Sequence, residues 1–243
     1  MELKLRLAIE RQPDDETCGP TCLHAVYGYY QQQITLDALI TDVTALSEGG
    51  TLAVFLACDA LRRGYQATIY TYNVQIFDPT WFVSVGFPAT DIAEKLRLQA
   101  DAKLDNKLQY ATSGYLEFLK RGGQLRFEEL TAELIEARLD AGNPLITGLS
   151  ATYLYRECRE IGRDGEEDDV RGYPQGHFVV ICGYDPPSST LLLADPLQPN
   201  PVSTSRIYPV DIDRAINAIM LGVLTYDANL LVLEPGPAST PSA

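Results

Sequence analysis

Residues 12–26 read QPDDETCGPTCLHAV, from Gln12 to Val26, and this stretch decides the fold. Polar residues with capping chemistry precede Cys18, and an apolar helical pattern starts at that cysteine and continues to residue 31. A thiol at the start of a helix lies at the positive end of the helix dipole, which favours the nucleophilic thiolate. The stretch therefore predicts a reactive cysteine at a helix N-terminus.

Only two histidines occur in the chain, so the choice of a general base is narrow. His24 lies about 240° around the same helix from Cys18, so we expect it to face away and to be a packing or surface residue. His177 follows Gly176 at the start of an apolar strand, where an imidazole can lie beside the thiolate. The sequence therefore predicts Cys18 as the nucleophile and His177 as the base.

Asp195 ends the strand that follows the His177 strand. If the two strands form a hairpin, the two residues lie about opposite each other, and the carboxylate can hold the imidazole tautomer. Asp185 is the rival carboxylate, but its turn position places it a strand length away from His177. Asp195 is therefore predicted to be the third member of the site.

Gln12 lies one short loop before Cys18. We expect its side-chain amide to donate to a developing oxyanion, together with the backbone N–H of Cys18. Cys22 lies one helical turn after Cys18 and is interpreted as a packing residue. A metal site at this cysteine pair would need two more ligands nearby, and the sequence offers none, so no metal or cofactor is expected.

Together these motifs resemble a known family. The pattern Gln-x5-Cys-Gly-x-x-Cys, a later Gly-His-Phe-Val-Val strand and a strand ending in Asp-Pro are similar to the bacteriocin-processing cysteine peptidases, which remove double-glycine leaders, and to their stand-alone bacterial relatives. The resemblance implies a papain-like α+β fold, in which an N-terminal helical half carrying the nucleophile packs on an antiparallel sheet carrying the histidine and the aspartate. It assigns the oxyanion role to Gln12, the attack to Cys18, and the rest of the triad to His177 and Asp195.

The interval between the cysteine and the histidine is much longer than in the compact leader peptidases. We expect a single catalytic domain over residues 1–234 with a helical insertion at about 84–123, followed by a disordered tail at 235–243. Residues 1–10 alternate polar and apolar side chains and predict a strand, and another strand is expected near 202–208. Residues 156–175 contain eleven charged side chains and three glycines, which predicts a mobile acidic loop.

The composition limits the class of partner. The chain has 243 residues, of which 46% are hydrophobic and 21% charged, and its net charge of −14 argues against a nucleic-acid footprint and against binding to anionic membranes. No stretch approaches the roughly 18 apolar residues of a membrane helix. Five cysteines are an odd number without framework spacing, which favours a reducing cytoplasm. A peptide or protein substrate is therefore expected, without nucleic acid or membrane.

The leading hypothesis is a cytoplasmic cysteine peptidase or amidase that cleaves a peptide or isopeptide bond through a thioester acyl-enzyme. One alternative is an acyltransferase or transpeptidase that uses the same Cys-His-Asp site and passes the acyl group to an amine or thiol. A second alternative is a non-catalytic peptide-binding module on the same scaffold. The acidic loop predicts a preference for basic or uncharged residues in the substrate.

Overall fold

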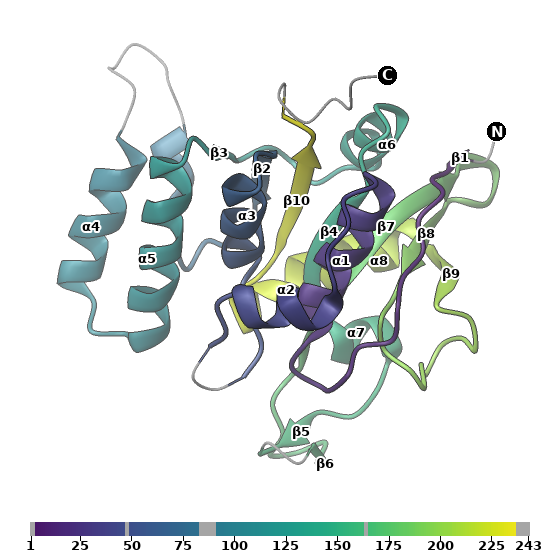
Figure 1. Cartoon of the computed structure of the whole chain (residues 1–243). Helices are drawn as coiled ribbons and strands as arrows, with labels where there is room; N and C mark the ends of the chain where they lie inside the picture. The colour runs from purple at the N-terminus through teal and green to yellow at the C-terminus, as the bar shows by residue number, and fades with distance from the viewer. Residues whose placement is uncertain (1–2, 47–48, 83–90, 163–164, 237–243) are drawn as a thin grey trace.

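The computed structural model describes residues 3–46, 49–82, 91–162 and 165–236. Within these residues a central sheet has the strand order β3-β2-β10-β4-β7-β8-β9, and β1 pairs with β7 beside this path (Figure 1). Neighbouring strands are antiparallel except for β2 and β3. The strands of this sheet are β1 (Leu3–Lys4), β2 (Gln66–Thr71), β3 (Gln124–Arg126), β4 (Leu145–Ser150), β7 (Gly176–Asp185), β8 (Thr190–Ala194), β9 (Ile207–Asp211) and β10 (Asn229–Glu234).

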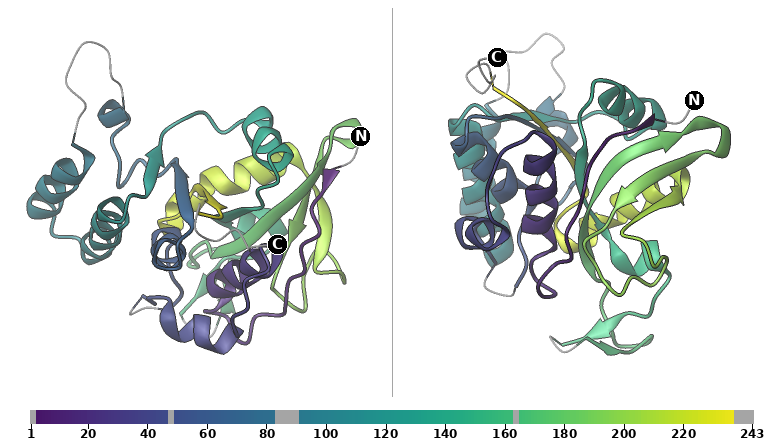
Figure 2. Two further views of the ribbon diagram at one scale, coloured as in Figure 1. Left: turned by 45° about the horizontal axis from the view of Figure 1, so that its top comes forward. Right: turned by 45° about the vertical axis from the view of Figure 1, so that its right-hand side comes forward.

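Helices cover both faces of the sheet (Figures 1 and 2). Side chains alternate along each strand, so Ile146 and Val180 enter the core beneath α1 and α3, while Leu145 and Ile181 enter the core beneath α6 and α8. This arrangement confirms the predicted α+β class, with an N-terminal helical part packed on a mostly antiparallel sheet. The helices are α1 (Cys18–Tyr29), α2 (Leu36–Asp42), α3 (Ala53–Arg62), α4 (Ile92–Ala102), α5 (Asn106–Lys120), α6 (Ala132–Asp140), α7 (Ala151–Tyr155) and α8 (Ile212–Leu221), with 3-10 turns η1 (Pro79–Phe82), η2 (Pro186–Ser188) and η3 (Gly222–Thr225).

Helix α1 begins at Cys18, as its sequence pattern predicts. Cys22, Leu23 and Val26 are fully buried, because these positions face the sheet. Gly19 allows α1 to approach closely, since a Cβ there would lie 2.6 Å from the Thr51 side chain. The helix that carries the predicted nucleophile is thus fixed by packing along its whole inner face.

Helices α4 and α5 lie within the range predicted as a helical insertion, and they extend to one side of the sheet (Figure 2). The carboxylates of Asp91 and Asp105 cap their N-termini, accepting hydrogen bonds from backbone N–H groups of the first turn. Helix α5 packs against α3 at Gly114, where a Cβ would lie 2.8 Å from Phe55. Residues 84–90 of this insertion and residues 237–243 of the predicted tail lie outside the described residues.

The strand predicted for residues 1–10 is wrong beyond Lys4. Leu5, Leu7 and Ile9 are buried with exposed residues between them, so the side chains alternate as predicted. However, the backbone N–H of Leu7 donates to the carbonyl oxygen of Leu5 at 2.9 Å, and this turn ends the ladder with β7. The alternation therefore predicts correctly which side chains are buried, but it does not predict how far the strand pairing extends.

The strand predicted near 202–208 begins only at Ile207. The side-chain oxygen of Asn200 accepts hydrogen bonds from the backbone N–H groups of Val202 and Ser203, at 2.9 and 3.2 Å. An asparagine that binds the backbone two residues later forms a local turn, which competes with strand formation. The loop before β9 is therefore longer than expected.

Residues 156–175, called the acidic hairpin below, contain regular pairing that the sequence did not predict. Strand β5 (Glu160–Ile161) pairs with β6 (Glu166–Glu167), and Glu160 also pairs with Tyr173. Both ends are fixed to α7, a helix that was not predicted. At one end the N–H of Glu157 donates to the backbone oxygen of Thr152 at 3.3 Å. At the other end the N–H of Ala151 donates to the backbone oxygen of Gln175 at 2.9 Å, and the N–H of Gln175 donates to the Thr152 hydroxyl at 2.9 Å. The acidic hairpin is thus held at its base beside the strand that begins with Gly176.

Candidate active site

Cys18 is the first residue of α1 and is partly exposed. The loop before it is a tight turn, in which the Thr17 hydroxyl donates to the backbone oxygen of Asp14 and accepts from its N–H. No side chain caps the first turn of α1. The positive end of the helix dipole therefore favours negative charge on the sulfur of Cys18, in a position that solvent and ligands can reach.

His177 is the second residue of β7 and is 7% exposed. Its Nε2 lies 2.9 Å from Oδ1 of Asp195, which leaves Nδ1 free to face Cys18. Burial by itself would lower the pKa of His177, but hydrogen bonding and charge from Asp195, together with a hydrogen bond to Cys18, raise it to about 10. The structure thus brings Cys18, His177 and Asp195 together, and it favours the imidazolium form of the histidine.

Asp195 and His177 are diagonal neighbours rather than opposite each other, as the sequence had suggested. In the β7–β8 ladder Val180 pairs with Ala194, so the same register places Asp195 opposite Val179. An irregularity between Ile181 and Gly183 shifts the register of the hairpin. Diagonal residues on one face of a sheet are still within reach of long side chains, which explains the 2.9 Å contact.

Asp195 is fully buried and accepts a dense set of hydrogen bonds. Oδ1 accepts from His177 and from the backbone N–H of Leu197 at 2.9 Å. Oδ2 accepts from the hydroxyls of Tyr155 and Tyr208, at 2.8 and 2.6 Å, and from the amide of Asn200 at 2.8 Å. Burial alone would raise the pKa of Asp195, but His177 and these donors lower it to about 2. Asp195 therefore stays ionised although its side chain is fully buried.

The sequence did not single out Tyr155, Tyr208 or Asn200. Tyr155 ends α7, Tyr208 lies in β9, and Asn200 lies in the loop between β8 and β9. They meet only because the sheet brings three separate segments to one carboxylate, so no local spacing marks them. The alternation in β9, where Tyr208 is buried and its neighbours are not, is the one pattern that indicates a buried tyrosine here.

Gln12 is 5% exposed and lies next to the loop that carries Asp195, since its backbone N–H donates to the oxygen of Pro196 at 3.0 Å. Its side-chain amide nitrogen donates to the backbone oxygen of Asp14 at 2.9 Å. An amide nitrogen carries two N–H groups, so one remains for a ligand. The side-chain oxygen of Gln12 is buried and has no hydrogen-bond partner.

The residues that the sequence set aside lie elsewhere or serve packing. The sulfur of Cys22 is fully buried and donates to the backbone oxygen of Phe178 at 3.3 Å. His24 binds the backbone oxygen of Ile34 at 3.1 Å, on the other side of α1. Asp185 ends β7 far from His177 and accepts from a serine hydroxyl in the turn. Among the described residues no group of His, Cys, Asp or Glu is placed to hold a metal ion.

This geometry can be compared with known proteins. Residues 98–218 match the model of the Peptidase_C39 like family. The chain resembles the C39-like peptidases. The match includes His177, Asp195 and the donors around Asp195, and it starts after the segment that carries Cys18. The fold is therefore of the cysteine-peptidase type. No curated protein matches the sequence.

Three solved structures align over nearly the whole chain. A double glycine motif protease from an AMS/PCAT transporter, in complex with the leader peptide, is 13% identical with a TM-score of 0.45 and covers 97% of this chain and 99% of its own. The peptidase domain of Streptococcus ComA, a bi-functional ABC transporter, is 14% identical with a TM-score of 0.42, covering 93% and 97%. A Bacillus anthracis protein described as a C39-like peptidase is 13% identical with a TM-score of 0.45, covering 96% and 98%. Similarities at this level assign no role to any residue of this chain. No helix among the described residues is long and apolar enough to cross a membrane.

Proposed function

We propose that the chain is a cysteine peptidase or amidase that cleaves a peptide or isopeptide bond through a thioester on Cys18. The observation that carries this proposal is the contact of His177 with Asp195 at 2.9 Å on one side and with Cys18 on the other, at the N-terminus of α1. A buried carboxylate, an imidazolium and a thiol at a helix start are the groups that nucleophilic acyl transfer requires.

In the proposed reaction the Cys18 thiolate attacks the carbonyl carbon, and the C=O electron pair moves to the oxygen. The backbone N–H of Cys18 and the free side-chain N–H of Gln12 donate to this oxyanion, and one such donor contributes roughly 3 kcal/mol. When the intermediate collapses, Nδ1 of His177 gives its proton to the leaving amine. His177 then takes a proton from water, which attacks the thioester and releases the acid and the free thiol.

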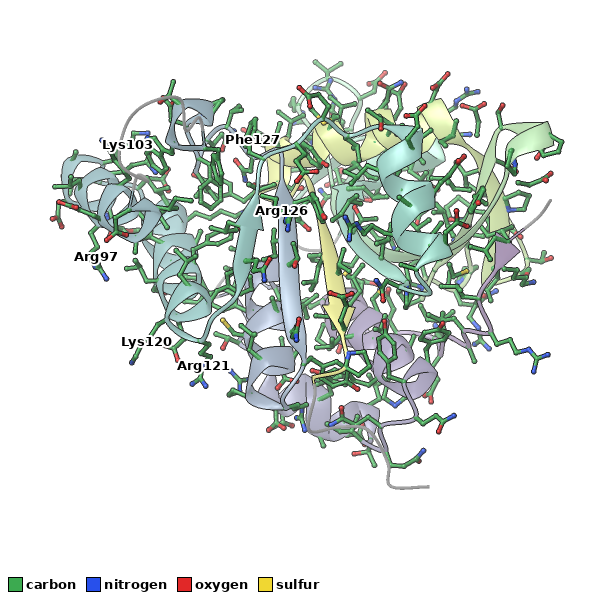
Figure 3. All side chains as sticks on the ribbon, turned by 90° about the horizontal axis from the view of Figure 1, so that it is seen from above. Arg97, Lys103, Lys120, Arg121, Arg126 and Phe127 are labelled. Atoms are coloured by element: carbon green, nitrogen blue, oxygen red, sulfur yellow. The ribbon has the colours of Figure 1, made fainter. Side chains whose placement is uncertain are left out.

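Charge near the site supports a preference for basic or uncharged substrate residues. The acidic hairpin carries seven acidic and four basic side chains. Burial raises the pKa of Glu160, and the negative charges of Glu157 and of Asp15, which belongs to the loop before Cys18, raise it further. Basic side chains are spread along α4, α5 and β3 and at the ends of these helices (Figure 3), and one of them, Arg121, pairs with Glu117 at 2.7 Å.

The deciding experiment is alkylation by iodoacetamide between pH 5 and 9, read at each cysteine by peptide mass spectrometry. Cys158 is the internal reference because it is also partly exposed but lies in the acidic hairpin. We expect Cys18 to react much faster than Cys158 at pH 6 in the wild type, and this advantage to disappear in His177→Ala. Equal rates for the two cysteines at pH 6 would contradict the proposal.

A peptide library then identifies the reaction, with Cys18→Ala as the inactive control. A free carboxylic acid product supports hydrolysis, whereas an adduct with an added amine supports acyl transfer. Replacing Glu157 and Glu160 by glutamine is expected to weaken cleavage of substrates with basic residues more than of neutral ones. An unchanged ratio would refute a role of the acidic hairpin in substrate choice.

A further inference from the structure

The three donors on Oδ2 of Asp195 distinguish this site from a simple Cys-His-Asp triad. Tyr208, Tyr155 and Asn200 lie 2.6, 2.8 and 2.8 Å from this oxygen. The other oxygen, Oδ1, accepts hydrogen bonds from His177 and from a backbone N–H, so both oxygens of the carboxylate have fixed hydrogen-bond donors. Such a carboxylate cannot rotate without breaking several hydrogen bonds at once.

The two tyrosines remain hydrogen-bond donors to the Asp195 carboxylate. Each is largely buried, and burial together with the negative charge of Asp195 raises the pKa of both hydroxyls, so both stay protonated donors. The Tyr155 ring also lies 6.0 Å from the His177 ring, at an angle of 52°. Tyr155 therefore contacts the acid and the base of the proposed triad at the same time.

We infer that Tyr155 and Tyr208 are positioning residues, which fix the Asp195 carboxylate in the orientation that holds His177 as an imidazolium facing Cys18. The inference rests on the proposed peptidase function, because it concerns the same site. Asn200 supports the carboxylate too, but its side-chain oxygen also shapes the loop before β9, so a variant there would change more than one interaction.

A purely structural role would be to satisfy a buried carboxylate without affecting the base. The two roles differ in what they predict for His177. If the hydroxyls orient Asp195, their removal weakens the charge-assisted hydrogen bond to Nε2, and the imidazolium loses stability. If they only satisfy Asp195, the protein becomes less stable while His177 titrates unchanged.

The test uses Tyr155→Phe, Tyr208→Phe and the double variant, which keep the rings and remove only the hydroxyls. Tyr184→Phe is the matched control, since the Tyr184 hydroxyl also donates to a carboxylate, that of Asp140 at 2.8 Å, but on the surface. The pKa of His177 is read by NMR from its ring Cε1–H signal. The chain has only one other histidine, His24, which serves as a reference in the same spectrum.

We expect the His177 pKa to fall by about 1 unit in the double variant, which corresponds to a tenfold loss of imidazolium stability. Each single variant should lower kcat roughly tenfold with little change in KM, as expected for one hydrogen bond to a charged group. Tyr184→Phe should match the wild type in both measurements. If one variant fails to fold, the other single variant decides.

The result that overturns the inference is a His177 that titrates in the double variant as in the wild type. This measurement needs no substrate, so it is independent of the peptidase assay. If the wild type cleaves no peptide and Cys18 is not reactive at pH 6, the proposed function fails, whatever the tyrosine variants show. If the wild type is active and the tyrosine variants keep both kcat and the His177 pKa, only the positioning role is refuted.

Discussion

Replacing Asp195 by asparagine tests the electrostatic logic of the whole site. The change keeps the shape of the side chain but removes its negative charge. The hydrogen bond from His177 to Asp195 is 2.9 Å long and charge-assisted, and such bonds contribute about 1.5–3 kcal/mol. Without it the thiolate–imidazolium pair is destabilised by the same amount relative to the neutral pair, which means a 10- to 100-fold smaller population (~1.4 kcal/mol per factor of ten).

An asparagine also fits the surrounding donors badly. Its NH2 group has to face either the backbone N–H of Leu197 or the amide of Asn200, because both oxygens of Asp195 accept hydrogen bonds. The variant is therefore expected to lose about 1–3 kcal/mol of stability as well. Chemical denaturation measures this loss, so that activity is compared only under conditions where the variant is folded.

The assay is the rate of iodoacetamide labelling of Cys18 at pH 6, relative to Cys158 in the same protein. Asp195→Asn should reduce this ratio 10- to 100-fold and lower kcat by a similar factor. Asp185→Asn is the control, since that carboxylate lies at the far end of β7 and should change neither value. Labelling of Cys18 that is as fast in Asp195→Asn as in the wild type would refute the reasoning.

Three further predictions concern stability. Asp59→Ala should destabilise the protein by about 1–3 kcal/mol in urea denaturation, because the buried Asp59 carboxylate accepts a hydrogen bond from Tyr27 at 2.8 Å and pairs with Arg63 at 2.7 Å; the change leaves the Tyr27 hydroxyl without this acceptor, while Arg63 keeps its pair with Asp42 at 2.8 Å. The pKa of His177 is about 10 in the folded protein against roughly 6.5 in the unfolded chain. The contribution of His177 to the free energy of unfolding is therefore complete below pH 6.5 and is lost as the pH rises to 10, with a slope of at most about 1.4 kcal/mol per pH unit. His177→Gln should remove this slope from the pH dependence of stability. Gly148→Ala should cost about 1–3 kcal/mol by overpacking, since its Cβ would lie 2.5 Å from Asp227; a thermal midpoint equal to that of the wild type would show that this site can relax.

The elements that the sequence predicted well are those with a local physical signature. Cys18 is marked by the change from polar to apolar residues at the start of α1, and Thr35 has the side-chain chemistry of a helix cap and caps α2. The Gln66–Thr71 strand alternates, and Gly64 ends the helix before it in a left-handed conformation with φ +86°. Each of these features depends on neighbours within a few residues along the chain.

The features that the sequence did not predict depend on contacts between distant segments. Tyr155 and Tyr208 meet at Asp195 only after β7, β8 and β9 have paired, and neither residue stands in a recognisable motif. The turn between Asp185 and Thr190 sets the register of the β7–β8 hairpin, so that Asp195 lies two positions from the place opposite His177 even after the irregularity near Ile181 has shifted the ladder by one residue. The order of the polar residues along the chain predicted which groups meet, but not the geometry in which they meet.

The acidic hairpin leaves the fold at Tyr155, which holds Asp195, and returns at Gly176, next to His177. Its base is closed by the two hydrogen bonds between Gln175 and the start of α7. The segment between these anchors is consequently a candidate for exchange as a unit, since its length and charge can be changed without altering the hydrogen bonds around Asp195. If the proposed peptidase activity holds, exchanging this segment for a neutral or a basic hairpin should change substrate selectivity and leave the reactivity of Cys18 as it is.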